Sequence, residues 1–198
     1  MTREPGEAAG RRWSWTLVML CLAAFGTMLA EGAAADWSAV LLREVGAPVG
    51  AAGLGYTAFA LAMFVGRVSG DNVARRIGHA RMVTAAALLG CAGTAAGFAV
   101  SGPASLVLAF AALGLGLSCL MPYLFVAAGD GPQGHALAVT AVSTSGYMGL
   151  LTGPALIGGL AGLISVLAAL WLLPVLLLLS SLPILYRATR RNIMDTDV

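Results

Sequence analysis

Few residues of this 198-residue chain could do chemistry, and they do not form a catalytic constellation. The two histidines, His79 and His135, fall outside the long apolar runs, so neither could face a serine inside them for nucleophilic catalysis. The three cysteines (Cys21, Cys91 and Cys119) lie inside apolar runs, where thiols behave as small hydrophobic side chains. No metal-ligand spacing and no phosphate-binding loop occurs. We therefore predict that the chain is not an enzyme and holds no metal or cofactor.

One acid stands out by its position. Glu31 follows an uncharged run of 18 residues and lies on the same helical face as Thr27. An ionisable side chain at such a depth predicts a proton site or a substrate contact. The alternative is that Glu31 reaches the outer interface with Asp36, near Trp37 as an interfacial anchor.

A row of hydroxyl groups follows one predicted helix. Thr140, Thr144 and Tyr147 are spaced by four and three residues, so they share one side of the helix, with Ser143 beside them. Such hydroxyls either line an aqueous cavity or hydrogen-bond to a neighbouring helix or to their own carbonyl at i−4. The presence of Tyr147 favours the cavity. By the same reasoning, Tyr56 and Tyr123 in other predicted spans are also candidate cavity residues. The predicted substrate-cavity residues are Glu31, Tyr56, Tyr123, Thr144 and Tyr147.

The elements that must position these residues are membrane-spanning helices. Hydrophobic residues make up 59% of the chain and charged residues 10%, against about 45–50% and 25% in soluble domains. With a net charge of +2, this composition excludes a soluble enzyme, a disordered tail and a nucleic-acid binder. A span needs about 20 apolar residues, and the uncharged runs 82–129 and 136–186 each hold two spans. In the fourth, Pro122 frees a backbone carbonyl one turn earlier, which marks either a kink useful for movement or a plain bend.

We predict an all-α membrane protein with six transmembrane helices, which places both termini on one side. The expected spans are 13–31, 47–66, 82–100, 104–127, 136–158 and 163–186, flanked by segments 1–12 and 187–198. There is no lysine, and ten of the eleven arginines fall on the side of the termini; only Arg43 falls on the other. The positive-inside rule then predicts cytoplasmic termini and a multi-pass protein of the inner cell membrane. Many of the 26 glycines are spaced by four, which predicts closely packed helices.

A patterned segment, residues 66–78, joins the second and third predicted spans, and we call it the gate segment. Its plainest reading is an arginine loop that obeys the positive-inside rule. The spacing indicates more, because two glycines four apart leave room at the helix end, an aspartate sits at the membrane boundary, and an arginine and a glycine close a short turn. The residues in this pattern are Gly66, Arg67, Gly70, Asp71, Arg75 and Gly78.

The gate segment resembles the signature loop of the major facilitator superfamily, in the version found in the second half of those transporters. It departs from that pattern at Asn72, where arginine is common, and at Ala74, where a second acid is often seen. Residues 31–39, 114–122 and 143–159 also look like spans of such a protein. The chain is most similar to the fucose-permease-like and MosC-like group, and the resemblance covers nearly all of residues 13–186.

This resemblance implies transport of a small solute, sugar-like or another small organic molecule, by alternating access. Such transporters combine two six-span halves, each a 3+3 inverted repeat, and this chain resembles the C-terminal half. The gate segment would be a cytoplasmic gate, with Asp71 facing the positive end of a helix dipole in the other half. A second six-span half, either a separate chain or a second copy, is then the expected partner. The alternative is a membrane remnant that does not transport, or a module that binds another membrane protein.

Overall fold

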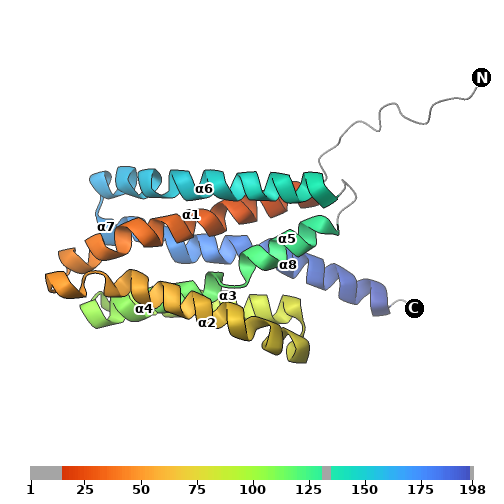
Figure 1. The fold of residues 1–198 in the computed structure, drawn as a ribbon, viewed down its shortest axis with the longest axis horizontal. Coiled ribbons are helices and arrows are strands. Elements are labelled where there is room, and N and C mark those ends of the chain that lie inside the picture. The colour runs from red at the N-terminus through yellow and green to blue at the C-terminus, as the bar shows by residue number, and fades with distance from the viewer. Residues whose placement is uncertain (1–14, 131–134, 197–198) are drawn as a thin grey trace, which may run out of the picture.

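The computed structural model describes residues 15–130 and 135–196, and these form helices joined by short turns (Figure 1). Six stretches in these ranges are long and apolar enough to cross a membrane, which confirms the predicted all-α fold with six spans. The fourth span is made of α4 and α5, and the sixth of α7 and α8. The elements are α1 (Trp15–Glu44), η1 (Val49–Ala51), α2 (Leu54–Ile77), α3 (His79–Val100), α4 (Pro103–Leu117), α5 (Leu120–Gly129), α6 (His135–Leu163), α7 (Val166–Leu170) and α8 (Leu172–Thr196).

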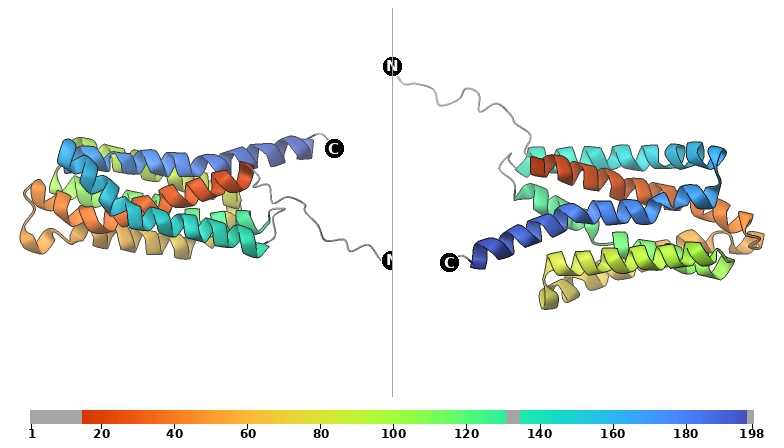
Figure 2. Two further views of the ribbon diagram at one scale, coloured as in Figure 1. Left: turned by 90° about the horizontal axis from the view of Figure 1, so that it is seen from above. Right: turned by 180° about the vertical axis from the view of Figure 1, so that it is seen from behind.

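The helices form a bundle with two broad faces. Figure 1 looks onto the face made by α6, α1, α5 and α2, and the right-hand view of Figure 2 looks onto α8 and α3. The most extensive packing joins α1 to α6, α3 to α4, and α2 to α4. Helix α1 begins, and α2 and α8 end, at one end of the bundle. We call it the arginine end, because the exposed residues Arg75, Arg76 and Arg81 lie there.

Two helices extend further than the charge pattern predicts. Helix α1 continues 13 residues past Glu31, and α2 runs through most of the gate segment to Ile77. Charges set the predicted boundaries, whereas the helices end where the backbone turns: Gly46 and Gly78 have φ values of +86° and +88°, which favour glycine. The gate segment is therefore helical up to Gly78 and not a loop.

The predicted flanking segments are covered only in part. Residues 1–12 and Trp13, with the arginines predicted there, lie outside the described residues. Helix α8 continues beyond the predicted end at 186 to Thr196.

Helices α1 and α6 approach each other backbone to backbone. Glycines on α6 take the place of side chains and face carbonyl groups of α1, so that a methyl group added at Gly153 would lie 2.6 Å from the Leu29 carbonyl oxygen. Close approach of this kind is how helices gain packing energy in lipid, where no hydrophobic effect drives them together. Three positions on α6, each four residues apart, meet three carbonyls of α1 with the same spacing: Ser145 on Cys21, Gly149 on Phe25, and Gly153 on Leu29.

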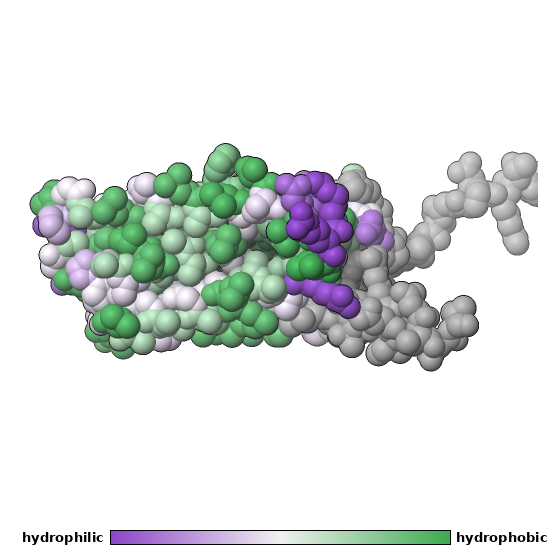
Figure 3. Space-filling model, turned by 90° about the horizontal axis from the view of Figure 1, so that it is seen from below, coloured by the Kyte–Doolittle hydropathy of each residue, from purple (hydrophilic) through white to green (hydrophobic). Residues whose placement is uncertain are grey.

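The other two helix pairs use the same device. Gly114 of α4 packs against the backbone of Phe59 of α2, and a methyl group at Gly90 of α3 would lie 2.7 Å from the Cα of Gly116. Around these contacts the largest buried side chains, among them Phe59, Phe98 and Phe110, fill the core. The outer surface seen in Figure 3 is hydrophobic along most of the bundle, and hydrophilic residues gather at the arginine end. This distribution suits a bundle surrounded by lipid.

The close α1–α6 approach predicts a sharp difference between two glycines of α6. Replacing Gly149 with alanine puts a methyl group against the Phe25 backbone and should destabilise the protein by about 1–3 kcal/mol, as overpacking does. Nothing lies within 4 Å of the same position at Gly159, so Gly159→Ala should be neutral, or stabilising by up to about 1 kcal/mol through helix propensity. Thermal unfolding in detergent, followed by circular dichroism, measures both. Equal midpoints for the two variants would contradict the packing described here.

Candidate functional site

A cavity of about 460 Å³ opens at the arginine end between α2, α3 and α5. It mixes apolar walls with charged and hydroxyl groups from several helices, so it suits water and polar solutes better than lipid tails. Its polar lining comes from Arg67, Asp71, His79, Ser118, Tyr123 and Asp130.

This cavity combines residues that the sequence analysis placed in two separate sets. Arg67, Gly70 and Asp71 come from the predicted gate segment, and Tyr123 from the predicted substrate cavity. They meet because α2 remains helical through the gate segment and lies beside the break between α4 and α5. Half of the predicted gate residues and one predicted substrate-cavity residue, Tyr123, therefore line the same space at the arginine end.

The fourth span is broken beside this cavity. Helix α4 ends at Leu117, and α5 begins at Leu120. Because Pro122 has no N–H, the carbonyl of Ser118 lacks its partner at i+4. The structure supplies a substitute donor from another helix: Nε of Arg67 donates to the Ser118 carbonyl at 3.3 Å.

The two glycines Gly66 and Gly70 of the gate segment leave the space in which this break packs against α2. Gly66 lies against Ser118, and a methyl group at Gly70 would lie 2.7 Å from Sγ of Cys119. The thiol of Cys119 also donates to the Gly66 carbonyl, at 3.5 Å. The predicted space at the helix end is thus filled by the α4–α5 break.

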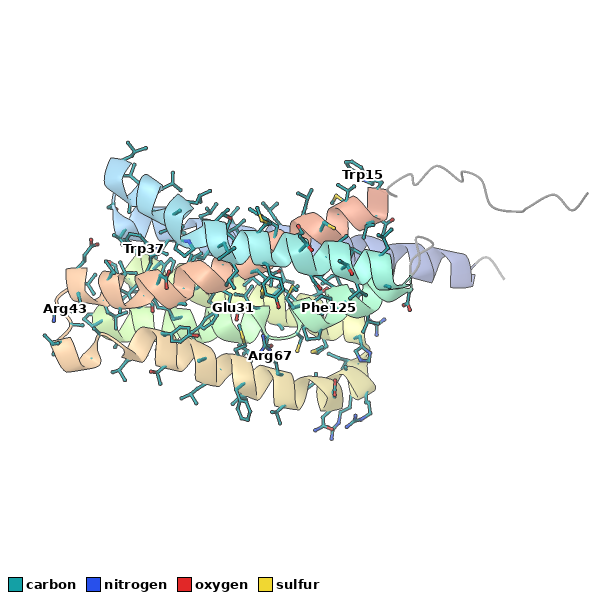
Figure 4. The ribbon with its side chains drawn as sticks, turned by 45° about the horizontal axis from the view of Figure 1, so that its top comes forward. Trp15, Glu31, Trp37, Arg43, Arg67 and Phe125 are labelled. Carbon is teal, nitrogen blue, oxygen red and sulfur yellow. The ribbon has the colours of Figure 1, made fainter. Side chains whose placement is uncertain are left out.

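Glu31 lies near the middle of α1 and not at the outer end of the first span, where the shorter predicted span had placed it. Thirteen residues, or about 20 Å of helix, separate it from the end of α1 at Glu44. Its half-buried carboxyl group is close enough to Arg67 for the opposite charges to attract, without a direct ion pair between them, and Figure 4 shows where the two residues lie on α1 and α2. Trp37 packs inward, donating from Nε1 to the Pro154 carbonyl of α6 at 3.1 Å.

The hydroxyl row on α6 divides into two groups. Thr140 and Ser143 donate to carbonyls four residues earlier, at 2.8 and 2.9 Å, as one of the alternatives expected. Thr144 is exposed, and Tyr147 is 66% exposed. Tyr56 lies near the start of α2, far along the helix from the cavity, and stacks on Phe59 with 5.9 Å between ring centroids.

The remaining residues of the gate segment act locally. Arg75 donates to the side chain of Asn72, three residues earlier, and Gly78 makes the turn into α3. Neither residue lines the cavity. Within the described ranges, no group of three or more histidine, cysteine, aspartate or glutamate residues is placed to hold a metal ion.

Four of the polar and thiol-bearing residues that line the cavity were not predicted from the sequence: His79, Ser118, Cys119 and Asp130. For Ser118 and Cys119 a signal existed, because Pro122 marked a freed carbonyl one turn earlier. His79 and Asp130 follow helix ends closely in sequence, but nothing in their spacing indicated that α3 and α5 bring them to one cavity.

Comparison with curated proteins finds relatives among bacterial membrane proteins. An uncharacterized MFS-type transporter of Yersinia pestis is 36% identical over 170 residues, which is 85% of this chain and 44% of the relative. Membrane protein MosC of Rhizobium meliloti is 36% identical over 156 residues, covering 78% and 38%. An uncharacterized transporter of Sinorhizobium fredii is 33% identical over 149 residues, covering 73% and 39%.

The chain thus spans about two fifths of the length of these relatives. No protein-family model matches the chain. No solved structure matches it either.

If the cavity holds water, a residue that lines it should be more accessible to water than an exposed residue on the lipid-facing side of the bundle. In a variant without native cysteines, Asp71→Cys should react quickly with a membrane-impermeant thiol reagent applied from the arginine end, because only a hydrated thiol forms the reactive thiolate. Leu88→Cys, on the apolar outer side of α3 and 53% exposed in the bundle, should react several-fold more slowly. Mass spectrometry of the labelled protein gives both rates. Equal rates would show that the cavity is not filled with water.

Proposed function

This chain belongs to the major facilitator superfamily, and from that premise we propose that it forms one six-helix half of a small-solute transporter, the C-terminal half. The observation that carries the proposal is the charged cavity at the arginine end. There, Arg67, Gly70 and Asp71 of the predicted gate segment and Tyr123 of the predicted substrate cavity line a single space. The named relatives support membrane transport as the general activity.

The face shown in Figure 1 is the side on which we place the partner half. It carries α6, α1, α5 and α2, and Tyr147 exposes a hydroxyl-bearing ring on α6. A tyrosine exposed among apolar helices suits a hydrated cleft better than lipid tails, since its hydroxyl group needs a hydrogen-bond partner. The share of the relatives that this chain covers is also what one half of two would give. The partner is then a second six-span bundle, either a separate chain or a second copy.

The proposed substrate is a small polar solute, sugar-like or another small organic molecule. Glu31, Tyr123, Thr144 and Tyr147 offer one carboxylate and three hydroxyl groups, which suit a solute with several hydroxyl groups of its own. Alternating access by two rocking bundles would expose these groups to each side in turn.

We place the arginine end, with both termini, on the cytoplasmic side of the inner membrane. Arg75, Arg76 and Arg81 all lie at that end, in agreement with the positive-inside rule. Asp71 lines the cavity there and would close the gate by facing the positive end of a helix dipole in the partner half.

Removing the charge of Asp71 tests the gate. Asp71→Asn should slow solute uptake by about two- to thirtyfold, the range that corresponds to one lost charge–dipole contact, while the amount of protein in the membrane stays the same. The assay is uptake of a panel of radiolabelled monosaccharides into vesicles from cells that express the chain with its native flanking reading frames. The matched control is Arg76→Gln, an exposed charge on the same helix that does not line the cavity.

The alternative predicts a different outcome in the same assay. A remnant or an interaction module would give no saturable uptake, and it would tolerate Asp71→Asn and Glu31→Gln alike. Saturable uptake that Asp71→Asn leaves unchanged would remove the gate role of Asp71 but keep the transport function.

A further inference from the structure

The break in the fourth span has an acceptor that its own helix cannot satisfy. Pro122 removes the N–H that would bond to the Ser118 carbonyl, and this carbonyl lies in the middle of the span between α4 and α5. In lipid or in protein, an unpaired carbonyl is costly, so a broken helix needs a donor from elsewhere. Nε of Arg67, from α2, is that donor at 3.3 Å.

Arg67 is well placed for this task but would not stay there without a balancing charge. It lies ten residues, about 15 Å, before the end of α2, so its guanidinium group could instead extend toward water at the arginine end. Glu31, near the middle of α1, is half-buried and close enough to attract the guanidinium group without a direct ion pair. Asp71, one turn further along α2, and Asp130, at the end of α5, face the same cavity from its outer side, where they would attract Arg67 away from the break.

We propose that Arg67 is a positioning residue that fixes the angle between α4 and α5 by capping the Ser118 carbonyl, and that Glu31 keeps Arg67 at this carbonyl. Three helices are thereby connected through one side chain: α1 by charge, α2 by the covalent attachment of Arg67, and the α4–α5 break by the hydrogen bond. From the sequence, Arg67 was predicted to belong to a gate and Glu31 to a substrate cavity. In this proposal they act together on the α4–α5 break.

Through Glu31 and Arg67, a solute bound at Glu31 could change the structure of the arginine end. A group that competes for Glu31 would release Arg67 from the break, and α5, whose residues Tyr123 and Asp130 line the cavity, would then be free to shift. This consequence rests on the proposed transport function, whereas the capping itself does not.

Cys119 offers a direct reporter of the break. Cys119 borders the cavity but is only 9% exposed, and its thiol, one residue after Ser118, donates to the Gly66 carbonyl of α2 at 3.5 Å. If the break loosens from α2, the thiol becomes more accessible. In a Cys21→Ala/Cys91→Ala background, Cys119 is the one cysteine of the chain, so alkylation by N-ethylmaleimide in native membranes measures this opening without any substrate.

The proposal predicts an ordered set of alkylation rates. Arg67→Met should raise the rate about tenfold, the factor that corresponds to the loss of one charge-assisted hydrogen bond. Arg67→Lys keeps a cationic donor and should restore a rate close to that of the parent. Arg76→Met, which removes an exposed arginine of α2 away from the break, should leave the rate unchanged.

Glu31→Gln supplies the decisive comparison, because Glu31 does not line the cavity and, with no solute present, should affect the break only through Arg67. It should accelerate alkylation of the parent several-fold and have no further effect in the Arg67→Met background. The proposal is overturned if Arg67→Met reacts as slowly as the parent, or if Glu31→Gln accelerates both backgrounds equally. If Arg67→Met does not accumulate in the membrane, the other two variants still test the proposal. Only a capping role predicts slow alkylation of Cys119 in Arg67→Lys and fast alkylation in Glu31→Gln.

The labelling experiment separates this proposal from the proposed function. Rates that follow the predicted order in a chain that shows no uptake would keep the capping role and remove the transport role. Normal uptake with rates that do not change would do the reverse.

Discussion

The whole bundle depends on helices that approach each other closely enough for glycine to face a backbone carbonyl. Apolar side chains gain little by leaving lipid for protein, so the stability of the bundle must come from packing and from polar groups satisfied within it. Ser145, Gly149 and Gly153 of α6 achieve this against consecutive turns of α1, and Gly114 does so between α4 and α2. These two pairs include three helices of the face shown in Figure 1, α6, α1 and α2, and the fourth helix of that face, α5, continues the span that α4 begins. A methyl group added at either of these glycine contacts would push the two helices apart. The proposed cleft requires these helices to lie side by side.

Glycines that allow close packing of helices also form the cavity at the arginine end. Gly66 and Gly70 allow the α4–α5 break to lie directly on α2, which brings Arg67 to the carbonyl that Pro122 leaves free. The cavity at the arginine end then forms between α2, α3 and α5, and Asp71 and Tyr123 both line it. Charge is tolerated inside such a bundle because each charged group has a polar counterpart: Arg67 has a carbonyl and Glu31, and the outer acids have water at the end of the bundle.

The number and type of the helices were predictable, because length and composition fix how many times an apolar chain crosses lipid. Their boundaries were less so. Charges at Arg67 and Asp71 suggested a loop, but the helix ends only at Gly78, since a charge can stay in a helix that borders a polar cavity. The depth of Glu31 was misjudged for the same reason. The spacing of Gly66 and Gly70 predicted an empty space, whereas its occupants, Ser118 and Cys119, lie about 50 residues away and have no local signal apart from Pro122. The hydroxyl row on α6 was found, but only the structure shows that Thr140 and Ser143 bond to their own helix.

We propose that this six-helix bundle works as one of two halves. The most direct test is the mass of the particle that contains the tagged chain after crosslinking in its native membrane and gentle solubilisation, measured by native mass spectrometry. We expect a particle with a second six-span bundle, whether that is another chain, a second copy, or a longer polypeptide of which this sequence is part. A particle that holds a single chain of 20.0 kDa with bound lipid would contradict it.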